Sequence, residues 1–142
     1  YVIGRFLKPE ARKDIIEYFE KNNIVPTAMM DLSDGLSSDI LHICRQSNLG
    51  CRIHEDKIPI AEDTRNAAFK FSIDPTMCAL NGGEDYELLF TVSQQDYEKI
   101  NSNDQISIVG YMTDADEKTK LITKGGNTVD IVAQGWNAFG VK

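Results

Sequence analysis

Two stretches of the chain place apolar residues at helical spacing. The first follows Pro9, which suits a first helical turn, and its apolar stripe continues to Asn23. The second has four apolar residues at i, i+4, i+7 and i+8, the spacing of one helical face: Leu36, Ile40, Ile43 and Cys44. Gly50 is placed to end this second helix. Three further segments carry helix signals: 61–71, 75–80 and 94–100.

Short apolar runs bounded by glycine, proline or polar residues predict strands between these helices. The runs are 28–31, 51–54, 86–92, 106–112, 121–122 and 129–132. The last two flank Gly125, Gly126 and Asn127, which is typical of a hairpin turn. Because helices and strands interleave irregularly, we expect a single α+β domain with a mixed sheet.

Composition narrows the class of partner. The chain has 142 residues, 42% of them hydrophobic and 26% charged, as in an ordinary globular domain. A formal net charge of −7 argues against nucleic acid or an anionic membrane as the main partner, because both are polyanions. No apolar run approaches the roughly 18 residues of a membrane span. Three cysteines without metal-type spacing indicate buried, reduced thiols of a cytoplasmic protein: Cys44, Cys51 and Cys78.

A first acidic bend follows the predicted strand 28–31. Asp31 ends that strand, and Ser33 and Asp34 lie in a tight turn before the next helix. Carboxylate oxygens suit Mg²⁺, and the turn's backbone N–H groups and helix N-terminus would favour a phosphate. The alternative is that Ser33 or Asp34 only caps the helix. An EF-hand is excluded because the twelfth position is His42 rather than Glu.

A second acidic bend lies about 50 residues later. Gly82 and Gly83 free the backbone, Glu84 and Asp85 follow, and a strand comes next. We expect both bends at the same edge of the sheet, although the second could be a plain connection with solvated acids.

Near the end of the chain, Trp136 and Phe139 lie in a glycine-flanked tail. Their rings could dock in the core or stack on a flat cationic heterocycle.

The two bends carry a resemblance to a known family. The segments 30–39 (MDLSDGLSSD) and 82–92 (GGEDYELLFTV), in this order and separation, are similar to the carboxy-terminal domain of thiamine-monophosphate kinase. The loop at Ile58-Pro59, the start at Arg5-Phe6-Leu7 and the Gly-Trp ending are similar too, so the resemblance covers residues 1–142. It implies a three-layer α/β/α domain with a mixed sheet, like the carboxy-terminal domain of aminoimidazole-ribonucleotide synthetase.

The resemblance also implies an activity and its residues. The family transfers the γ-phosphoryl group of ATP to thiamine monophosphate, with Mg²⁺ as cofactor. Asp31 and Asp34 would then hold Mg²⁺ and Ser33 would contact ATP. Glu84 would face the thiamine, and Trp136 or Phe139 would pack on its rings; no residue acts beyond positioning metal and ligands.

The resemblance implies a larger enzyme as well. The family's amino-terminal ATP- and Mg²⁺-binding domain has no counterpart here, so we expect the chain to be inactive alone and the full-length enzyme to be a homodimer. Two rival readings remain. One is another ATP-dependent member of the same superfamily, making an aminoimidazole ribonucleotide or selenophosphate. The other is a non-catalytic module that binds a nucleotide or a protein.

Overall fold

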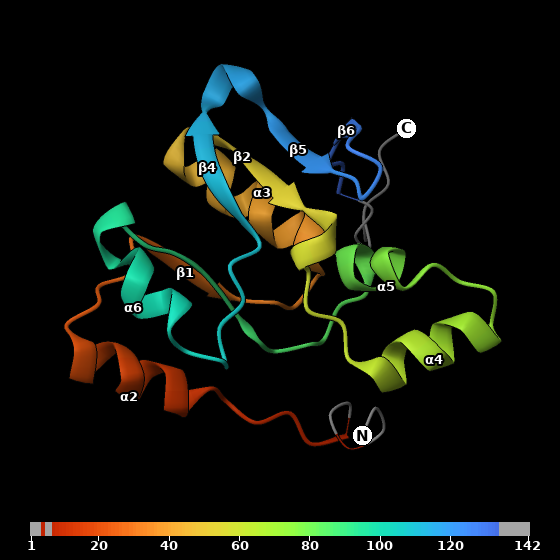
Figure 1. The fold of residues 1–142 in the computed structure, drawn as a ribbon, viewed down its shortest axis with the longest axis horizontal. Helices are drawn as coiled ribbons and strands as arrows, with labels where there is room; N and C mark the ends of the chain where they lie inside the picture. The colour runs from red at the N-terminus through yellow and green to blue at the C-terminus, as the bar shows by residue number, and fades with distance from the viewer. Residues whose placement is uncertain (1–3, 5–6, 134–142) are drawn as a thin grey trace.

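The computed structural model describes residue 4 and residues 7–133 (Figure 1). The α-helices of this part are α2 (Lys13–Asn22), α3 (Leu36–Ser47), α4 (Glu62–Lys70), α5 (Pro75–Asn81) and α6 (Tyr97–Asn101). The strands are β1 (Ala28–Asp31), β2 (Leu49–His54), β3 (Leu88–Thr91), β4 (Gly110–Asp114), β5 (Thr119–Ile122) and β6 (Thr128–Asp130). Short 3₁₀ turns lie at η1 (Glu55–Lys57), η2 (Gln94–Asp96) and η3 (Ala115–Glu117). Within the described part, every helix is too short or too polar to cross a bilayer.

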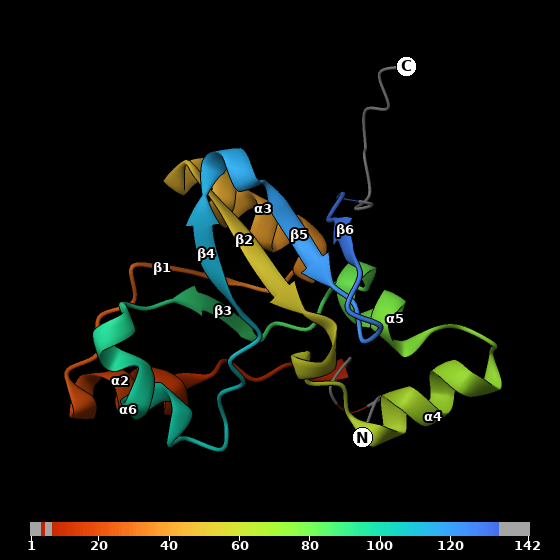
Figure 2. The same ribbon diagram turned by 45° about the horizontal axis from the view of Figure 1, so that its top comes forward.

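The strands form two sheets. A two-stranded sheet pairs β1 with β3 in antiparallel register, and a four-stranded sheet has the order β4-β2-β5-β6 (Figure 2). In the larger sheet β2 and β5 run parallel while the other neighbours are antiparallel. The predicted mixed sheet and the predicted hairpin around residues 125–127 are therefore confirmed.

Strand β3 separates two apolar cores, which gives the domain its three layers. Because side chains alternate along a strand, Leu89 faces a core built on α3, whereas Leu88 and Phe90 face a second core. That second core is closed by α2 and α6, and the Phe19 ring meets Phe90 edge-on with centroids 4.9 Å apart. Helix α3 thus covers one face of the β1–β3 sheet and also packs against β2 of the larger sheet, while the α2–α6 pair covers the other face of β3, in keeping with the predicted α/β/α class.

Several element ends differ from the sequence prediction. Asn48, not Gly50, ends α3: it adopts the left-handed φ of 52° and its N–H returns to the last turn. Gly50 lies in β2, where a Cβ would come 2.5 Å from the carbonyl oxygen of Lys118. Residues 94–100, predicted as one helix, form the 3₁₀ turn η2 followed by the α-helix α6.

Two of the three cysteines lie in the larger core. Cys44 and Cys51 are buried, Cys78 is half-buried, and all three are free thiols, as predicted. A hydrogen bond with Cys44, together with burial, raises the pKa of the Cys51 thiol and so favours its protonated form.

Candidate functional site

A short antiparallel ladder joins the two acidic bends. Asp31 pairs with Leu88 at the end of the β1–β3 sheet, and the pairing continues past the strands. The N–H of Leu32 donates to the Glu87 carbonyl (2.8 Å), and the N–H of Tyr86 donates to the Leu32 carbonyl (2.9 Å). The predicted convergence of the two bends at one sheet edge is confirmed.

Gly83 lets the second bend lie directly on the first. The Glu84 N–H donates to the Ser33 carbonyl at 2.9 Å. A Cβ on Gly83 would come 2.4 Å from that same carbonyl oxygen, closer than real Cβ atoms approach. Only glycine fits here, which gives a physical reason for the glycine pair before the acids.

The backbone of the second bend adopts an uncommon conformation. Glu84 and Tyr86 have φ values of 65° and 52°, in the left-handed region that non-glycine residues rarely occupy. The hydrogen bonds to Ser33 and Leu32 hold both residues there. Such conformations cluster at functional sites, where surrounding structure maintains them.

The predicted metal and ATP ligands of the first bend differ in their exposure to solvent. Asp31 and Asp34 are exposed and Ser33 is half-buried. Their oxygen donors suit Mg²⁺, which usually takes one or two carboxylates and completes its shell with phosphate oxygens and water. Within the described residues, no group of three or more His, Cys, Asp or Glu side chains gathers into a metal cluster. The assignment of Asp31 and Asp34 as Mg²⁺ ligands therefore stays a prediction.

Asp39 holds the first bend from beneath. Its carboxylate is fully buried, and Oδ2 accepts the N–H groups of Ser33 (3.0 Å) and Asp34 (3.2 Å). Burial raises the pKa of Asp39, while the bonds from Asp34 and Ser33 act against that rise. These two N–H groups are therefore engaged inside the protein. The expectation that the amides of this turn bind phosphate is wrong for Ser33 and Asp34.

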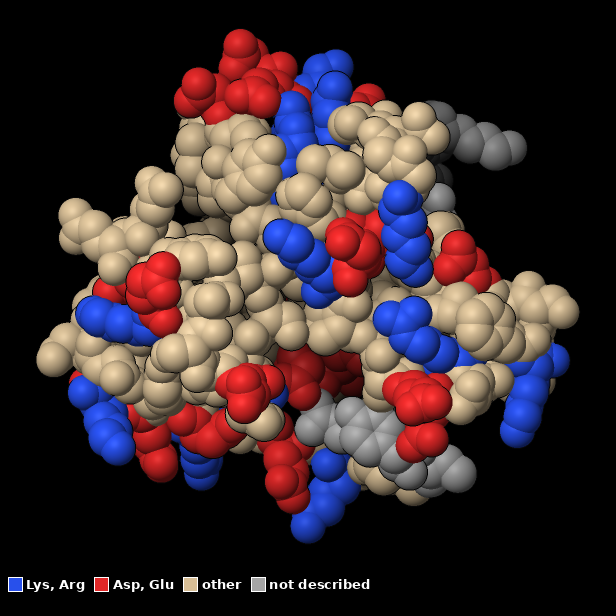
Figure 3. Space-filling model, in the orientation of Figure 1, with Lys and Arg blue, Asp and Glu red and all other residues tan. Residues whose placement is uncertain are grey.

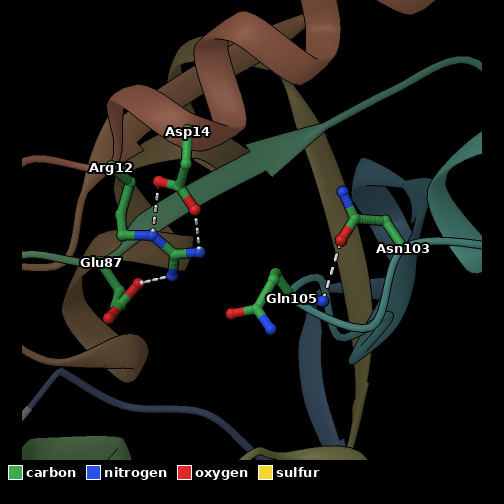
Figure 4. Close-up of polar contacts among 5 residues, drawn as sticks. All are labelled: Arg12, Asp14, Glu87, Asn103 and Gln105. Carbon is green, nitrogen blue, oxygen red and sulfur yellow. Dashed lines mark hydrogen bonds and ion pairs between the residues drawn. The ribbon is translucent and has the colours of Figure 1, made fainter.

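The Arg12 guanidinium binds the end of the second bend. Arg12 donates to the Glu87 carboxylate at 2.6 Å and forms two hydrogen bonds with Asp14 (Figure 4). The Asp14 hydrogen bonds, with the Glu87 pair, raise the pKa of Arg12, and Arg12 in turn lowers the pKa of Asp14. Arg12 thus ties the segment before α2 to the strand that leaves the bend.

A crevice of about 1430 Å³ opens beside the second bend. Three acids of the bend line it: Glu84, Asp85 and Glu87. Figure 3 shows acidic side chains deep in a hollow on this face of the molecule. Across the crevice lies Gln105, whose N–H donates to the Asn103 side chain at 2.9 Å (Figure 4). The lining does not include Asp31, Ser33 or Asp34, so Glu84 faces a different space from the predicted metal ligands.

Sequence reasoning placed some of these residues and missed others. It named Asp31, Ser33, Asp34 and Glu84, and the structure brings their backbones together. Trp136 and Phe139 lie outside the described residues, so their roles stay predictions.

Asp39 and Arg12 were missed. An acid three residues after Leu36, on the apolar face of its helix, was the available signal for Asp39. Arg12 offered none, because its partner Glu87 is 75 residues away.

Known proteins resemble this chain in both sequence and fold. Residues 6–122 match the family model described as AIR synthase related protein, C-terminal domain. The thiamine-monophosphate kinase of Buchnera aphidicola subsp. Schizaphis graminum is 39% identical over 145 residues, covering 98% of this chain and 43% of the relative. The kinase of Aquifex aeolicus is 38% identical over 90 residues, 63% of this chain and 28% of the relative. The chain thus spans less than half the length of these relatives.

Solved structures share the fold. A structure of AaThiL complexed with AMPPCP and TMP matches with a TM-score of 0.75 and 29% identity, covering 96% of this chain and 40% of that one. Thiamine-monophosphate kinase from Stenotrophomonas maltophilia K279a matches at 0.70 and 25% identity, over 91% and 39%. Hydrogenase maturation protein HypE has the same fold at a TM-score of 0.69 but only 15% identity. The resemblance drawn from the two acidic bends is confirmed, and the chain belongs to the family of C-terminal domains of AIR synthase related proteins.

Proposed function

We propose that this chain is the carboxy-terminal part, residues 1–142, of a kinase that phosphorylates thiamine monophosphate. The γ-phosphoryl group of ATP passes to the phosphate of thiamine monophosphate, giving ADP and thiamine diphosphate. The observation that carries the proposal is the ladder between the bends, which brings the backbone of residues 31–34 against the backbone of Glu84. Phosphoryl transfer depends mainly on positioning and charge neutralisation, so it suits a site of this kind.

Each bend has its own task in this proposal. Asp31 and Asp34 hold Mg²⁺, and the Ser33 hydroxyl contacts ATP. Mg²⁺ held by these two carboxylates would offset the negative charge of the phosphates during transfer. Glu84, at the crevice, faces the thiamine, whose cationic thiazolium ring suits a carboxylate. An aromatic ring of the tail, Trp136 or Phe139, packs on the thiamine rings.

The similarity to named kinases favours this activity over the rival ones. The relatives at 39% and 38% identity are named thiamine-monophosphate kinases, and AaThiL was solved with TMP and the ATP analogue AMPPCP. HypE is only 15% identical to this chain, so its similarity shows a common fold and does not indicate a common activity. Fold alone therefore does not separate members of the superfamily, whereas the sequence identity to the named kinases favours this activity.

The proposal includes a second domain. The chain covers 43% of the first relative, and we infer that an amino-terminal ATP- and Mg²⁺-binding domain completes the site. From the family resemblance we also propose that the full-length enzyme is a cytoplasmic homodimer and that the 142-residue chain is inactive alone. Formation of thiamine diphosphate from ATP by the isolated chain contradicts this part of the proposal.

Kinetics of the full-length kinase test the residue roles. Asp31→Asn and Asp34→Asn should each lower kcat by about tenfold or more, because each removes a charge that holds the metal. Glu84→Ala should chiefly raise KM for thiamine monophosphate. Asp116→Asn, an exposed acid in η3, is the matched control and should leave both constants unchanged. Wild-type kinetics in all three site variants would refute the assignment.

A further inference from the structure

Asp39 is a buried acid that lowers the stability of the folded domain. It lies in the first turn of α3, a helix that packs against β1 and β2, and none of its surface is exposed. Oδ2 accepts two backbone N–H groups, but Oδ1 is buried and has no hydrogen-bond partner among the described residues. A half-satisfied buried carboxylate destabilises a fold, so packing alone gives no reason for an acid here.

The two bonds of Asp39 fix the peptide units that carry the proposed nucleotide and metal ligands. The N–H of Ser33 and the N–H of Asp34 both point inward to the carboxylate. On the opposite side, the Ser33 carbonyl accepts from Glu84. Ser33 is therefore held on its donor side by α3 and on its acceptor side by the second bend. With its backbone fixed, only its hydroxyl remains to meet a ligand.

We propose that Asp39 is a positioning residue for the metal–nucleotide site. It fixes the Ser33–Asp34 backbone so that the Ser33 hydroxyl and the Asp34 carboxylate keep one orientation toward the ligand. This inference rests on the proposed function. A misplacement of about 1 Å in such a group lowers a rate by about 100-fold, so the backbone anchor affects turnover without touching substrate.

Two substitutions at position 39 distinguish the effect of losing the hydrogen-bond acceptor from the effect of changing the side-chain volume. Asp39→Asn keeps an oxygen that can accept both N–H groups, whereas Asp39→Leu fills a similar volume with no acceptor. Asp63→Asn is the matched control, because Asp63 is an exposed acid in the first turn of α4. In the full-length kinase, Asp39→Leu should lower kcat/KM for ATP by about tenfold or more and leave KM for thiamine monophosphate within about twofold. Asp39→Asn should recover to within about threefold of wild type, and Asp63→Asn should equal it.

Amide hydrogen exchange gives a readout that does not depend on activity. In the wild-type protein, the N–H groups of Ser33 and Asp34 should exchange slowly although Asp34 is exposed. Asp39→Leu should speed both amides while the amides of β2 keep their protection, and Asp39→Asn should restore them. Fast exchange at both amides in the wild type overturns the inference, and this measurement stands even if Asp39→Leu does not fold.

A folded Asp39→Leu enzyme with wild-type kinetics also overturns the inference. So does an Asp39→Asn variant as impaired as Asp39→Leu, since the acceptor would then not be what matters. A wild-type kinase with no activity on thiamine monophosphate contradicts the proposed function instead. In that case the amide exchange still decides whether Asp39 anchors the bend.

Discussion

Adding one methyl group at Gly83 should separate the two acidic bends. A Cβ built on Gly83 lies 2.4 Å from the Ser33 carbonyl oxygen, 3.3 Å from its carbonyl carbon and 3.4 Å from the Asp34 Cα. All three neighbours are backbone atoms, so no side-chain rotation relieves the overlap. Reaching even 3.0 Å from the oxygen requires a shift of at least 3.0 − 2.4 = 0.6 Å. That shift lengthens the 2.9 Å hydrogen bond from Glu84 N–H to the same oxygen.

The expected cost follows from the overlap. Inserting a methyl group into a tightly packed place typically destabilises a protein by about 1–3 kcal/mol. For a chain of this length, that corresponds to a fall in Tm of about 4–12 °C. Gly83 has no left-handed φ, so the alanine meets no additional backbone strain. The whole effect of Gly83→Ala is therefore steric and local to the bends.

Thermal unfolding of Gly83→Ala beside Gly125→Ala tests this reasoning. At Gly125 the nearest atoms to a new Cβ are side-chain atoms at 3.8 and 3.9 Å, so this alanine should leave the Tm nearly unchanged. In the full-length kinase, Gly83→Ala should also lower kcat/KM while Gly125→Ala does not. Equal Tm and equal kinetics for the two variants would show that the bends do not pack as the structure has them.

Three further outcomes are expected, each measured by urea unfolding. Arg12→Met should destabilise the chain by about 1 kcal/mol, because it removes the hydrogen-bonded pairs with Glu87 and Asp14. Arg12 lowers the pKa of Asp14 below its usual 3.8, so the Asp14 share of this stability is fully present above pH 3.8. It is lost as the pH falls through the lowered pKa. The stabilities of the variant and the wild type should therefore converge in acid. Ile40→Ala, at a residue only 3% exposed, should cost about 2–5 kcal/mol, whereas Phe71→Ser, at one 76% exposed, should change stability by less than about 0.5 kcal/mol.

The order of elements was predictable because it depends on local patterns. The apolar spacing of Leu36, Ile40 and Ile43 located α3, and all three are buried in the larger core. The Gly-Gly-Asn turn located the β5–β6 hairpin. The predicted end of α3 was wrong because two nearby residues can each end the helix. Asn48 adopts the left-handed conformation that ends α3, and Gly50 then lies in β2. Such competition between neighbours is decided by tertiary packing rather than by propensity.

The site was predictable only as far as its exposed acids. Asp31 and Asp34 follow a strand and Glu84 follows two glycines, and these are local signals. The residues that fix them act over long distances or from inside a helix. Arg12 reaches Glu87 across 75 residues, and Asp39 looks in sequence like any acid near a helix N-terminus. Pairing between distant segments must be known before either role can be assigned.

The same contacts determine what a ligand can meet at the two bends. The N–H groups of Leu32, Ser33, Asp34, Glu84 and Tyr86 all donate within the protein. Anions that bind to loops commonly do so through such backbone donors, and these five are already occupied. The side chains of Asp31, Asp34 and Glu84 are exposed, and their negative charge disfavours a phosphate. A phosphate would therefore approach these acids more readily with a cation between, which is the role that the proposed function gives to Mg²⁺ held by Asp31 and Asp34.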